Sequence, residues 1–341
     1  MTRAANGRLA LPAALVFLAG ALLTGVLVGP VDLGAVNVVH ATFAHVFGLH
    51  SPLSGGDDAI LWELRLPRVI LAALVGGTLA AAGASYQGVF RNPLADPYLL
   101  GAAAGAGLGA TVVVAYAPGS ALTGDLLPLG AFVGAALAVV AAYVLGRSAG
   151  IAAGPAALVL AGVTIASFLT ALQTFVQQQH VDTVQEVYSW LLGRLATSGW
   201  REVGIVLPYA IVAWVIILAH RRLLDVLSVG DEEAAALGVH VARVRLLVVA
   251  AATIATAAAV AVAGLIGFVG IIVPHTIRLL VGGSYRLLLP LSVIVGAGFL
   301  VFADVIARTI VSPAELPIGV VTAFFGAPFF AVVLRTSKRF A

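Results

Sequence analysis

Two groups of charged residues lie in segments of this sequence that are otherwise apolar. Arg65 and Arg68 belong to the segment LRLPR, and a guanidinium group can bind a carboxylate through two parallel hydrogen bonds. Asp304 and Arg308 are four residues apart, a spacing that brings two side chains together on one helix face, and Glu315 follows soon after. We expect an internal ion pair between Asp304 and Arg308. For Arg65 and Arg68 we expect exposed guanidiniums that either bind an anionic partner or anchor a helix end.

A third group lies in the longest polar segment of the chain, residues 221–245. It contains three consecutive acidic residues, Asp231, Glu232 and Glu233. They would place negative charge at the positive end of a short helix, with Ser228 in a capping box before it and Gly238 as its stop. A helix of about two turns is unstable alone in water. We therefore expect it either to dock on another structure or to be a solvated connector.

The residue types that carry most enzyme chemistry are missing. There is no cysteine, and the only lysine is Lys338, whereas a Walker A loop needs a lysine directly after its glycine to reach the phosphates. No HExxH or GxSxG motif occurs, and His275 and the other histidines lack the spacing of metal ligands. We predict no catalytic residue, no metal site, no cofactor and no enzymatic activity in this chain.

The composition indicates what positions these groups. The chain has 341 residues, of which 61% are hydrophobic and 10% are charged, with a mean hydropathy of +1.10. Soluble globular proteins average about 45–50% apolar and about 25% charged residues. The sequence therefore predicts an integral membrane protein and excludes a soluble enzyme and a disordered chain.

Uncharged runs of about 20 residues are long enough to cross the hydrocarbon core as helices. The runs are Leu9–Val31, Val69–Phe90, Pro97–Gly124, Leu126–Gly146, Ser148–Val181, Val203–Ala219, Leu246–Ile277, Leu287–Ala303 and Leu316–Leu334. We divide Leu246–Ile277 into a full helix and a short one, because Gly264, Gly267, Gly270 and Pro274 interrupt it. The prediction is an all-α polytopic membrane protein with about ten transmembrane helices in a single domain, residues 1–341, in which Gly105 and Gly109 form a GxxxG packing motif.

The basic residues set the orientation. With the amino end in the cytoplasm, the outer side receives only Arg65, Arg68, Arg194, Arg201 and Arg308, and the other basic residues of the 18 lie inside. This bias is the one that the positive-inside rule requires. We expect both termini and the segment 221–245, between helices six and seven, in the cytoplasm of a cell inner or plasma membrane.

Four blocks of sequence resemble the FecCD family, the permeases of type II ABC importers. The blocks are ELRLPRVILAALVGGTLAAAGASYQGVFRNPLADPYLLG (Glu63–Gly101), DEEAAALGVHVARVR (Asp231–Arg245), GLIGFVGIIVPHTIR (Gly264–Arg278) and ADVIARTIVSPAELPIGVVTAFFGAPFF (Ala303–Phe330). They run from the second helix to the last in the family's order. The resemblance implies the permease fold of that family.

The resemblance also implies partners and roles for individual residues. The partners would be a second copy of the chain, two cytoplasmic ATPase subunits that bind ATP and Mg²⁺, and an extracytoplasmic solute-binding protein, with no nucleic acid. Docking of the binding protein would fall to the outer arginines Arg65, Arg68 and Arg308. Coupling to the ATPase would fall to the short acidic helix, namely Asp231, Glu232, Glu233, Ala236, Leu237 and Gly238.

The family's fifth helix lines the translocation pathway at the dimer axis. In this sequence that helix carries four polar residues spaced for one face, Ser167, Thr170, Thr174 and Gln177. Gln173 and Gln178 would add to an uncharged polar lining. The alternative is that these side chains only form hydrogen bonds between helices. The resemblance implies an iron chelate as substrate (a ferric siderophore or haem), with cobalamin next.

An ion-coupled secondary transporter is the alternative function. It would need a buried acidic residue or a sodium site near the middle of the membrane, whereas the acidic residues here lie at membrane edges or in loops. The sequence therefore favours a permease that depends on a separate ATPase.

Overall fold

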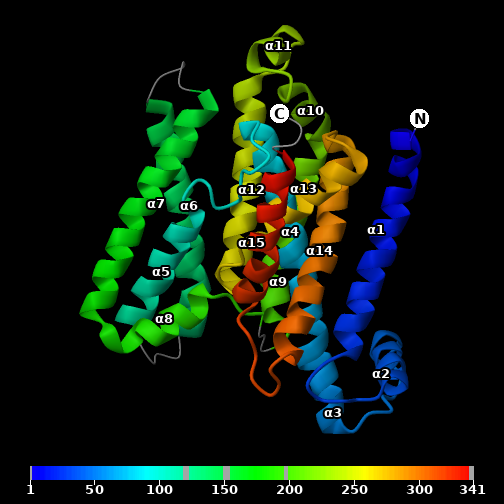
Figure 1. Cartoon of the computed structure of the whole chain (residues 1–341). Coiled ribbons are helices and arrows are strands. Elements are labelled where there is room, and N and C mark those ends of the chain that lie inside the picture. Colours follow the sequence, from blue (N-terminus) through cyan, green and yellow to red (C-terminus); the bar gives the residue numbers. More distant parts are fainter. Residues whose placement is uncertain (1, 118–122, 149–153, 196–198, 338–341) are drawn as a thin grey trace.

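The computed structural model describes residues 2–117, 123–148, 154–195 and 199–337, and these residues form helices joined by loops (Figure 1). In chain order the helices are α1 (Thr2–Leu27), α2 (Ala35–Phe47), α3 (Gly55–Ala59), the π-helix η1 (Ile60–Arg65), α4 (Leu66–Phe90), α5 (Ala102–Tyr116), α6 (Thr123–Ser148), α7 (Gly154–Gln179), the 3₁₀ helix η3 (Val181–Thr183), α8 (Val184–Leu191), α9 (Arg201–Ala219), α10 (Arg221–Leu227), α11 (Asp231–Ala236), α12 (Val241–Ala263), α13 (Val269–Val281), α14 (Tyr285–Thr309) and α15 (Ile318–Ser337).

Seven stretches of the described helices are long and apolar enough to cross a membrane. They are Leu9–Leu27, Gly55–Phe90, Asp125–Ser148, Ala156–Gln179, Arg201–Ala219, Val241–Ala263 and Tyr285–Thr309. The other expected spans correspond to the shorter apolar helices α5, α13 and α15. The all-helical membrane fold is thus confirmed, whereas the count of about ten spans stays a prediction.

The expected division of the run Leu246–Ile277 is confirmed. Helix α12 ends at Ala263, and α13 begins only at Val269. Gly264 and Phe268 bound this break, and both have positive φ angles, of 69° and 70°. A left-handed conformation cannot continue an α-helix, so the backbone turns here.

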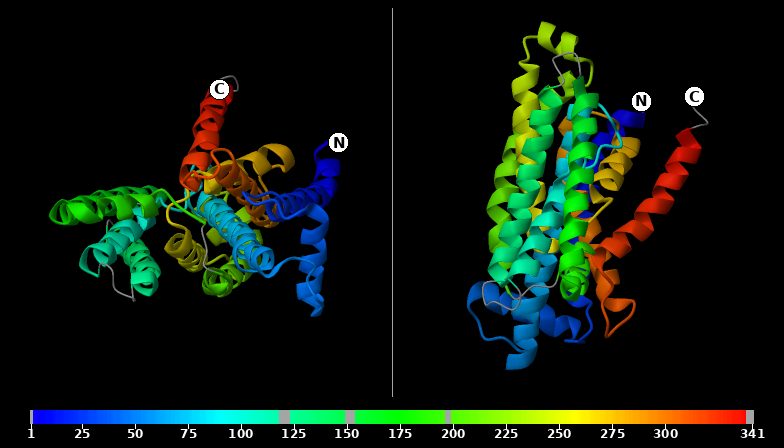
Figure 2. Two further views of the ribbon diagram at one scale, coloured as in Figure 1. Left: turned by 90° about the horizontal axis from the view of Figure 1, so that it is seen from below. Right: turned by 90° about the vertical axis from the view of Figure 1, so that its left-hand side faces the viewer.

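Helix α4 lies at the centre of the bundle, where almost every residue from Leu66 to Phe90 is buried (Figures 1 and 2). The sequence places Arg65 and Arg68 at the outer start of this helix, whose uncharged run begins at Val69. The structure extends it outward instead, because η1 and α3 continue the helix back to Gly55. Arg65 and Arg68 therefore lie within a continuous helix and not at its first turn.

Glycines allow the helices to approach one another closely. A Cβ atom built on Gly83 of α4 would overlap the carbonyl of Gly270 on α13. The GxxxG residues Gly105 and Gly109 of α5 face the backbone of Gly134 and Gly130 on α6 in the same way. Membrane helices associate through such contacts because lipid tails compete for ordinary apolar contact, and the packing role of the GxxxG motif is confirmed.

Two helices leave large surfaces uncovered. Helix α7 lies at the edge of the bundle beside α5 and α6, and α15 leans away from its neighbours toward its carboxyl end (Figure 2). Both expose large apolar side chains, among them Phe168 and Phe175 on α7 and Phe324 and Val332 on α15. The start of α1, the end of α15 and the short helix α11 lie at one end of the molecule (Figure 1), whereas α2, α3 and α8 lie at the other.

We predict that Gly83→Ala lowers the free energy of unfolding by about 1–3 kcal/mol, because the added methyl group must push apart α4 and α13. Gly20→Ala on α1 is the matched control, since a Cβ atom there meets nothing within 4 Å. Thermal unfolding of both variants in detergent measures the effect. An equal melting temperature for the two variants would contradict close packing at Gly83.

Candidate functional site

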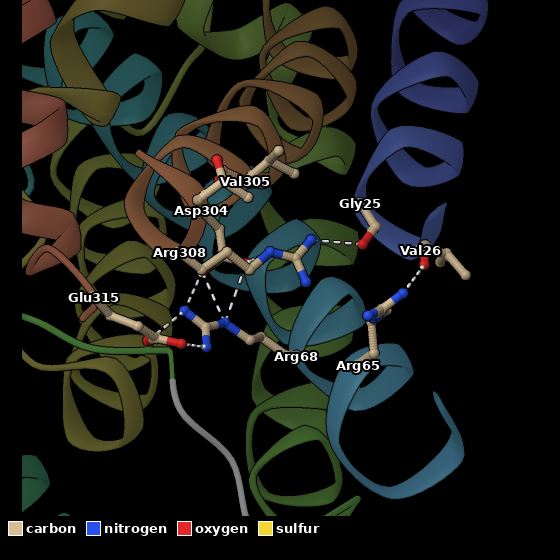
Figure 3. A network of polar contacts seen from close by, with 9 residues as sticks. Gly25, Val26, Arg65, Arg68, Asp304, Val305, Arg308 and Glu315 are labelled. Carbon is tan, nitrogen blue, oxygen red and sulfur yellow. Dashed lines mark hydrogen bonds and ion pairs between the residues drawn. The ribbon is translucent and has the colours of Figure 1, made fainter. Parts of the chain in front are cut away.

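A network of charged side chains joins α4, α14 and the loop before α15 (Figure 3). It lies at the end of the bundle that carries α2, α3 and α8, which is the end predicted to be the outer one. Arg68 lies on α4, shortly after η1, and donates from Nε to Asp304 Oδ1 over 2.9 Å. Its two Nη atoms donate to the carboxylate of Glu315 over 2.8 and 3.0 Å. Arg308 Nε lies 3.5 Å from Asp304 Oδ2. The expected ion pair between Asp304 and Arg308 is confirmed, and it belongs to a larger network.

Arg65 and Arg308 bind the carboxyl end of α1. Arg308 donates from Nη2 to the carbonyl of Gly25, and Arg65 donates to the carbonyl of Val26 over 3.2 Å. Arg65 also donates to the carbonyl of Val31, in the loop after α1, over 2.6 Å. The last carbonyls of a helix have no partner within it and carry partial negative charge. The two guanidiniums therefore satisfy backbone groups that would otherwise lack partners.

The expectation that Arg65 and Arg68 are exposed is wrong for Arg65, and Arg308, which was expected in an internal ion pair, is buried as well. Arg65 is 4% exposed and Arg308 is 3% exposed. Arg68 is half-buried and is covered on its outer side by Glu315, whose side chain is 43% exposed. The role of these arginines in docking a binding protein stays a prediction, and Arg68 is the one of them nearest to the surface.

At the opposite end, α11 is the outermost helix (Figure 1). Asp231 accepts hydrogen bonds from Arg245 of α12 over 3.0 and 3.1 Å and lies 3.4 Å from Arg91, the residue after α4. Glu232 and Glu233 are exposed. The three acidic residues thus divide into one that ties α11 to the bundle and two that face away from it.

The ends of α11 differ in part from the expectation. Ser228 does not cap the helix, because its hydroxyl donates to the carbonyl of Asp225 and the N-cap is Gly230. Gly238 has a φ of 81° and follows the helix, as a stop residue should. Leu237, beside it, is 71% exposed, and Ala236 is exposed as well. The tip of α11 therefore exposes acidic and apolar groups side by side.

The polar residues predicted for the pathway lie on the uncovered face of α7. Ser167, Thr170 and Thr174 are exposed and Gln177 is half-exposed. The hydroxyls of Ser167 and Thr174 donate to the carbonyls one turn earlier, so they do not bond to a neighbouring helix of this chain. Gln173 is 8% exposed and packs against Gly107 of α5. Its expected place in the lining is therefore wrong.

The described residues contain no group of three or more His, Asp or Glu side chains that could hold a metal ion. His275 packs edge to face against Phe329, with 5.8 Å between the ring centroids. Its Nδ1 atom is buried without a hydrogen-bond partner.

Sequence reasoning missed the partners that tie both ends together. Glu315 lies 247 residues from Arg68, and no local spacing could pair them. For Arg91 and Arg245 the sequence predicts only a cytoplasmic position, although each contacts Asp231. Their position could have indicated this contact, because both lie at the predicted cytoplasmic end of a span, on the same side as the acidic segment.

We predict that Asp304→Asn lowers the free energy of unfolding by about 3–5 kcal/mol, because it leaves Arg68 and Arg308 without their shared buried counter-ion. Glu315→Gln removes the same charge at a more exposed position and should cost less than about 1 kcal/mol. Unfolding in detergent measures both. Equal losses for the two variants would contradict a central role for Asp304.

The sequence is similar to those of known proteins over most of its length. A cobalamin import system permease protein, BtuC of Halobacterium salinarum, is 40% identical over 90% of this chain and 81% of its own length. The Fe(3+)-citrate import system permease protein YfmE of Bacillus subtilis is 36% identical over 83% of this chain and 84% of its own.

A solved structure has the same fold. It is described as an inward-facing conformation of an ABC transporter assigned to the metal-chelate type, and it superposes with a TM-score of 0.82 at 28% identity, covering 95% of this chain and 98% of that one. The sequence pattern of the FecCD transport family matches residues 15–336. The chain is an integral membrane protein, because it has apolar helices that are long enough to span a bilayer. Because the match covers nearly the whole chain, the chain belongs to the FecCD transport family.

Proposed function

We propose that this chain is the membrane permease subunit of a binding-protein-dependent ABC importer for a metal chelate. The observation that carries the proposal is the family match over residues 15–336. Relatives named for cobalamin and for ferric citrate, together with a structural relative of the metal-chelate type, support the substrate class. An iron chelate, a ferric siderophore or haem, is our first choice, and cobalamin is the second.

The energy would come from two cytoplasmic ATPase subunits, since the sequence has no Walker A loop of its own. The tip of α11 suits the contact. Glu232, Glu233 and Leu237 are exposed at the outermost point of the end that also holds both termini. Because Asp231 ties α11 to Arg245 of α12, a movement of the ATPase would be passed on to the bundle. In this proposal that end faces the cytoplasm.

The transporter would contain two copies of the chain. Helices α7 and α15 carry large apolar side chains that the described part of one copy leaves exposed, such as Phe175 and Phe324, which are 60% and 77% exposed. Pairing two copies through these helices would cover such surfaces. The exposed residues Ser167, Thr170 and Thr174, with Gln177, would then lie near the axis and line the translocation pathway. A large ligand suits an uncharged lining of this kind because it must also leave.

The binding protein would dock at the outer end, where Arg65, Arg68 and Arg308 gather (Figure 3). Arg68 would make the first contact. Glu315 already shows that a carboxylate fits against its two Nη atoms, and an acidic residue of the binding protein would replace Glu315 there. Arg65 and Arg308 would support this contact from beneath, through the positive charge that they hold at the end of α1.

Reconstitution tests the proposal as a whole. In proteoliposomes, the chain with its ATPase subunits and binding protein should accumulate the chelate only when ATP is supplied. Accumulation by the chain alone, driven by an ion gradient, would favour a secondary transporter and contradict the proposal.

We predict that the double variant Glu232→Lys, Glu233→Lys weakens binding of the ATPase subunits at least about tenfold, which corresponds to about 1.4 kcal/mol. The reversed charges would repel the surface that the carboxylates contact. Titration of the detergent-solubilised permease with purified ATPase measures the effect. Glu63→Lys reverses an exposed carboxylate at the opposite end and serves as the control. Unchanged affinity in the double variant would refute the coupling role of α11.

We predict that Glu315→Gln strengthens docking of the binding protein about fivefold, or about 1 kcal/mol, because it removes the internal competitor for Arg68. Surface binding assays on the reconstituted permease measure the dissociation constant. Asp125→Asn is the matched control, since Asp125 is an exposed acidic residue paired with Arg201 at the same end. An equal change in both variants would indicate a general charge effect and contradict docking at Arg68.

A further inference from the structure

Helix α2 is an apolar element that lies across the outer end of the bundle and is not one of the long spans. It contains no Asp, Glu, Lys or Arg. Gly34 and Gly48, with φ angles of 74° and 67°, begin and end it. Its axis runs across the direction of the long helices (Figure 2). With 13 residues it is too short to cross a bilayer.

One face of α2 is held by the protein. Val38, Ala41 and Ala44 are buried, and the first two pack in a small hydrophobic cluster with Leu61 that is separate from the main core. On the same side the ring of His45 stacks on Trp62 with 4.2 Å between centroids. His45 Nε2 also lies 2.7 Å from Asp58 Oδ2. The orientation of α2 on η1 and α3 is therefore fixed.

The opposite face of α2 is apolar and uncovered. Its five large side chains recur at helical spacing on one face, namely Val36, Val39, Phe43, Val46 and Phe47. Phe43, Val46 and Phe47 are 59%, 65% and 66% exposed, and the rings of Phe43 and Phe47 stack on each other. The exposed polar residues Asn37 and His40 lie along one flank, and on the other flank the hydroxyl of the half-buried Thr42 donates to the carbonyl of Val38 within the helix. A contiguous apolar surface of this kind marks a contact with a membrane or another molecule.

We infer that this face of α2 lies in the outer leaflet of the bilayer, at the boundary between headgroups and acyl chains, so that α2 is an interfacial membrane anchor. An amphipathic helix that lies in the membrane plane buries its apolar face in this region. Asn37 and His40 then face the water, while Val39, Phe43 and Val46 face the acyl chains.

Continuity with the lipid-facing surface of the spans identifies lipid as the occupant. The outer end of α1 exposes Leu23 and Val28, and the same end packs on the α2 cluster through Val26 and Leu27. The apolar surface of α1 that faces lipid is therefore adjacent to the exposed face of α2.

The surrounding aromatic residues place α2 at the depth of the interface. Trp62 contacts Trp200 of the segment before α9, with 5.5 Å between the ring centroids, and tryptophans gather at membrane–water interfaces. A protein that docks and leaves requires polar and charged groups around its contact, whereas α2 offers no charged side chain. Lipid is thus favoured over a binding protein that docks and leaves.

The absence of cysteine from the sequence allows a direct test. Phe43→Cys, Val46→Cys and Asn37→Cys would each carry one environment-sensitive NBD fluorophore on the full chain. The proteins are reconstituted in phosphatidylcholine–phosphatidylglycerol vesicles, with and without nitroxide-labelled phosphatidylcholine. Folding of each variant is checked by its melting temperature before reconstitution.

We expect blue-shifted emission at residues 43 and 46, quenched several-fold more strongly by the lipid nitroxide than emission at residue 37. Water-like emission at 43 and 46 would overturn the inference. Blue-shifted emission that the lipid nitroxide does not quench would also overturn it, because a protein surface would then cover α2. Neither readout involves transport, so the result is independent of the proposed function.

Discussion

A buried guanidinium group in a membrane protein requires a partner within the protein, because the hydrocarbon core has no water to satisfy it. The outer end of this bundle is organised around that requirement. Asp304 supplies a shared counter-ion to Arg68 and Arg308, and the last carbonyls of α1 accept from Arg65 and Arg308. Three helices that are distant in sequence are held together by these bonds. A single carboxylate, 1% exposed, thus joins α4 to α14.

Closely packed helices and helices with exposed faces lie in different parts of the fold. Helices α4, α13 and α14 approach through glycines that leave no room for a methyl group, as at Gly83 and at Gly76 with Gly296. Helices α7 and α15 instead carry large side chains on uncovered faces. Helices that are closely packed through small residues resist movement relative to one another. A helix face of large exposed side chains can instead change its neighbours. The centre of the chain is therefore the most closely packed part, and the contacts with other molecules that we propose lie on α7, α15, α11 and α2.

Much of the architecture could be predicted from the sequence, since uninterrupted apolar runs indicate membrane spans. The glycines of the run Leu246–Ile277, together with Pro274, predict the break between α12 and α13. The extension of α4 to Gly55 was not predicted, because Asp57, Asp58 and Glu63 interrupt the apolar run there. Helix α2 was missed for a different reason. Its apolar segment is shorter than a span, and a length criterion discards it.

The burial of Arg65 and Arg308 was equally inaccessible to local reasoning. Arg308 binds a carbonyl 283 residues away, and Arg65 binds carbonyls at least 34 residues away. Charge type alone indicated an anionic partner, and the acceptors turned out to be backbone atoms at a helix end. In contrast, the pair Asp304–Arg308 was predictable, because its spacing of four residues is local.

The two ends of α4 explain how a permease of this kind could act as a unit. At its inner end Arg91 contacts Asp231 of α11, and at its outer end Arg68 binds Asp304 of α14 and Glu315 before α15. Almost the whole helix between them is buried, so it cannot bend without disturbing the core. Under the proposed function, a force applied to α11 would reach the docking end through a rigid helix rather than through a series of small side-chain shifts. The outer ion pairs would then be the bonds that such a movement strains, since Glu315 is the most exposed member of that network and belongs to a loop.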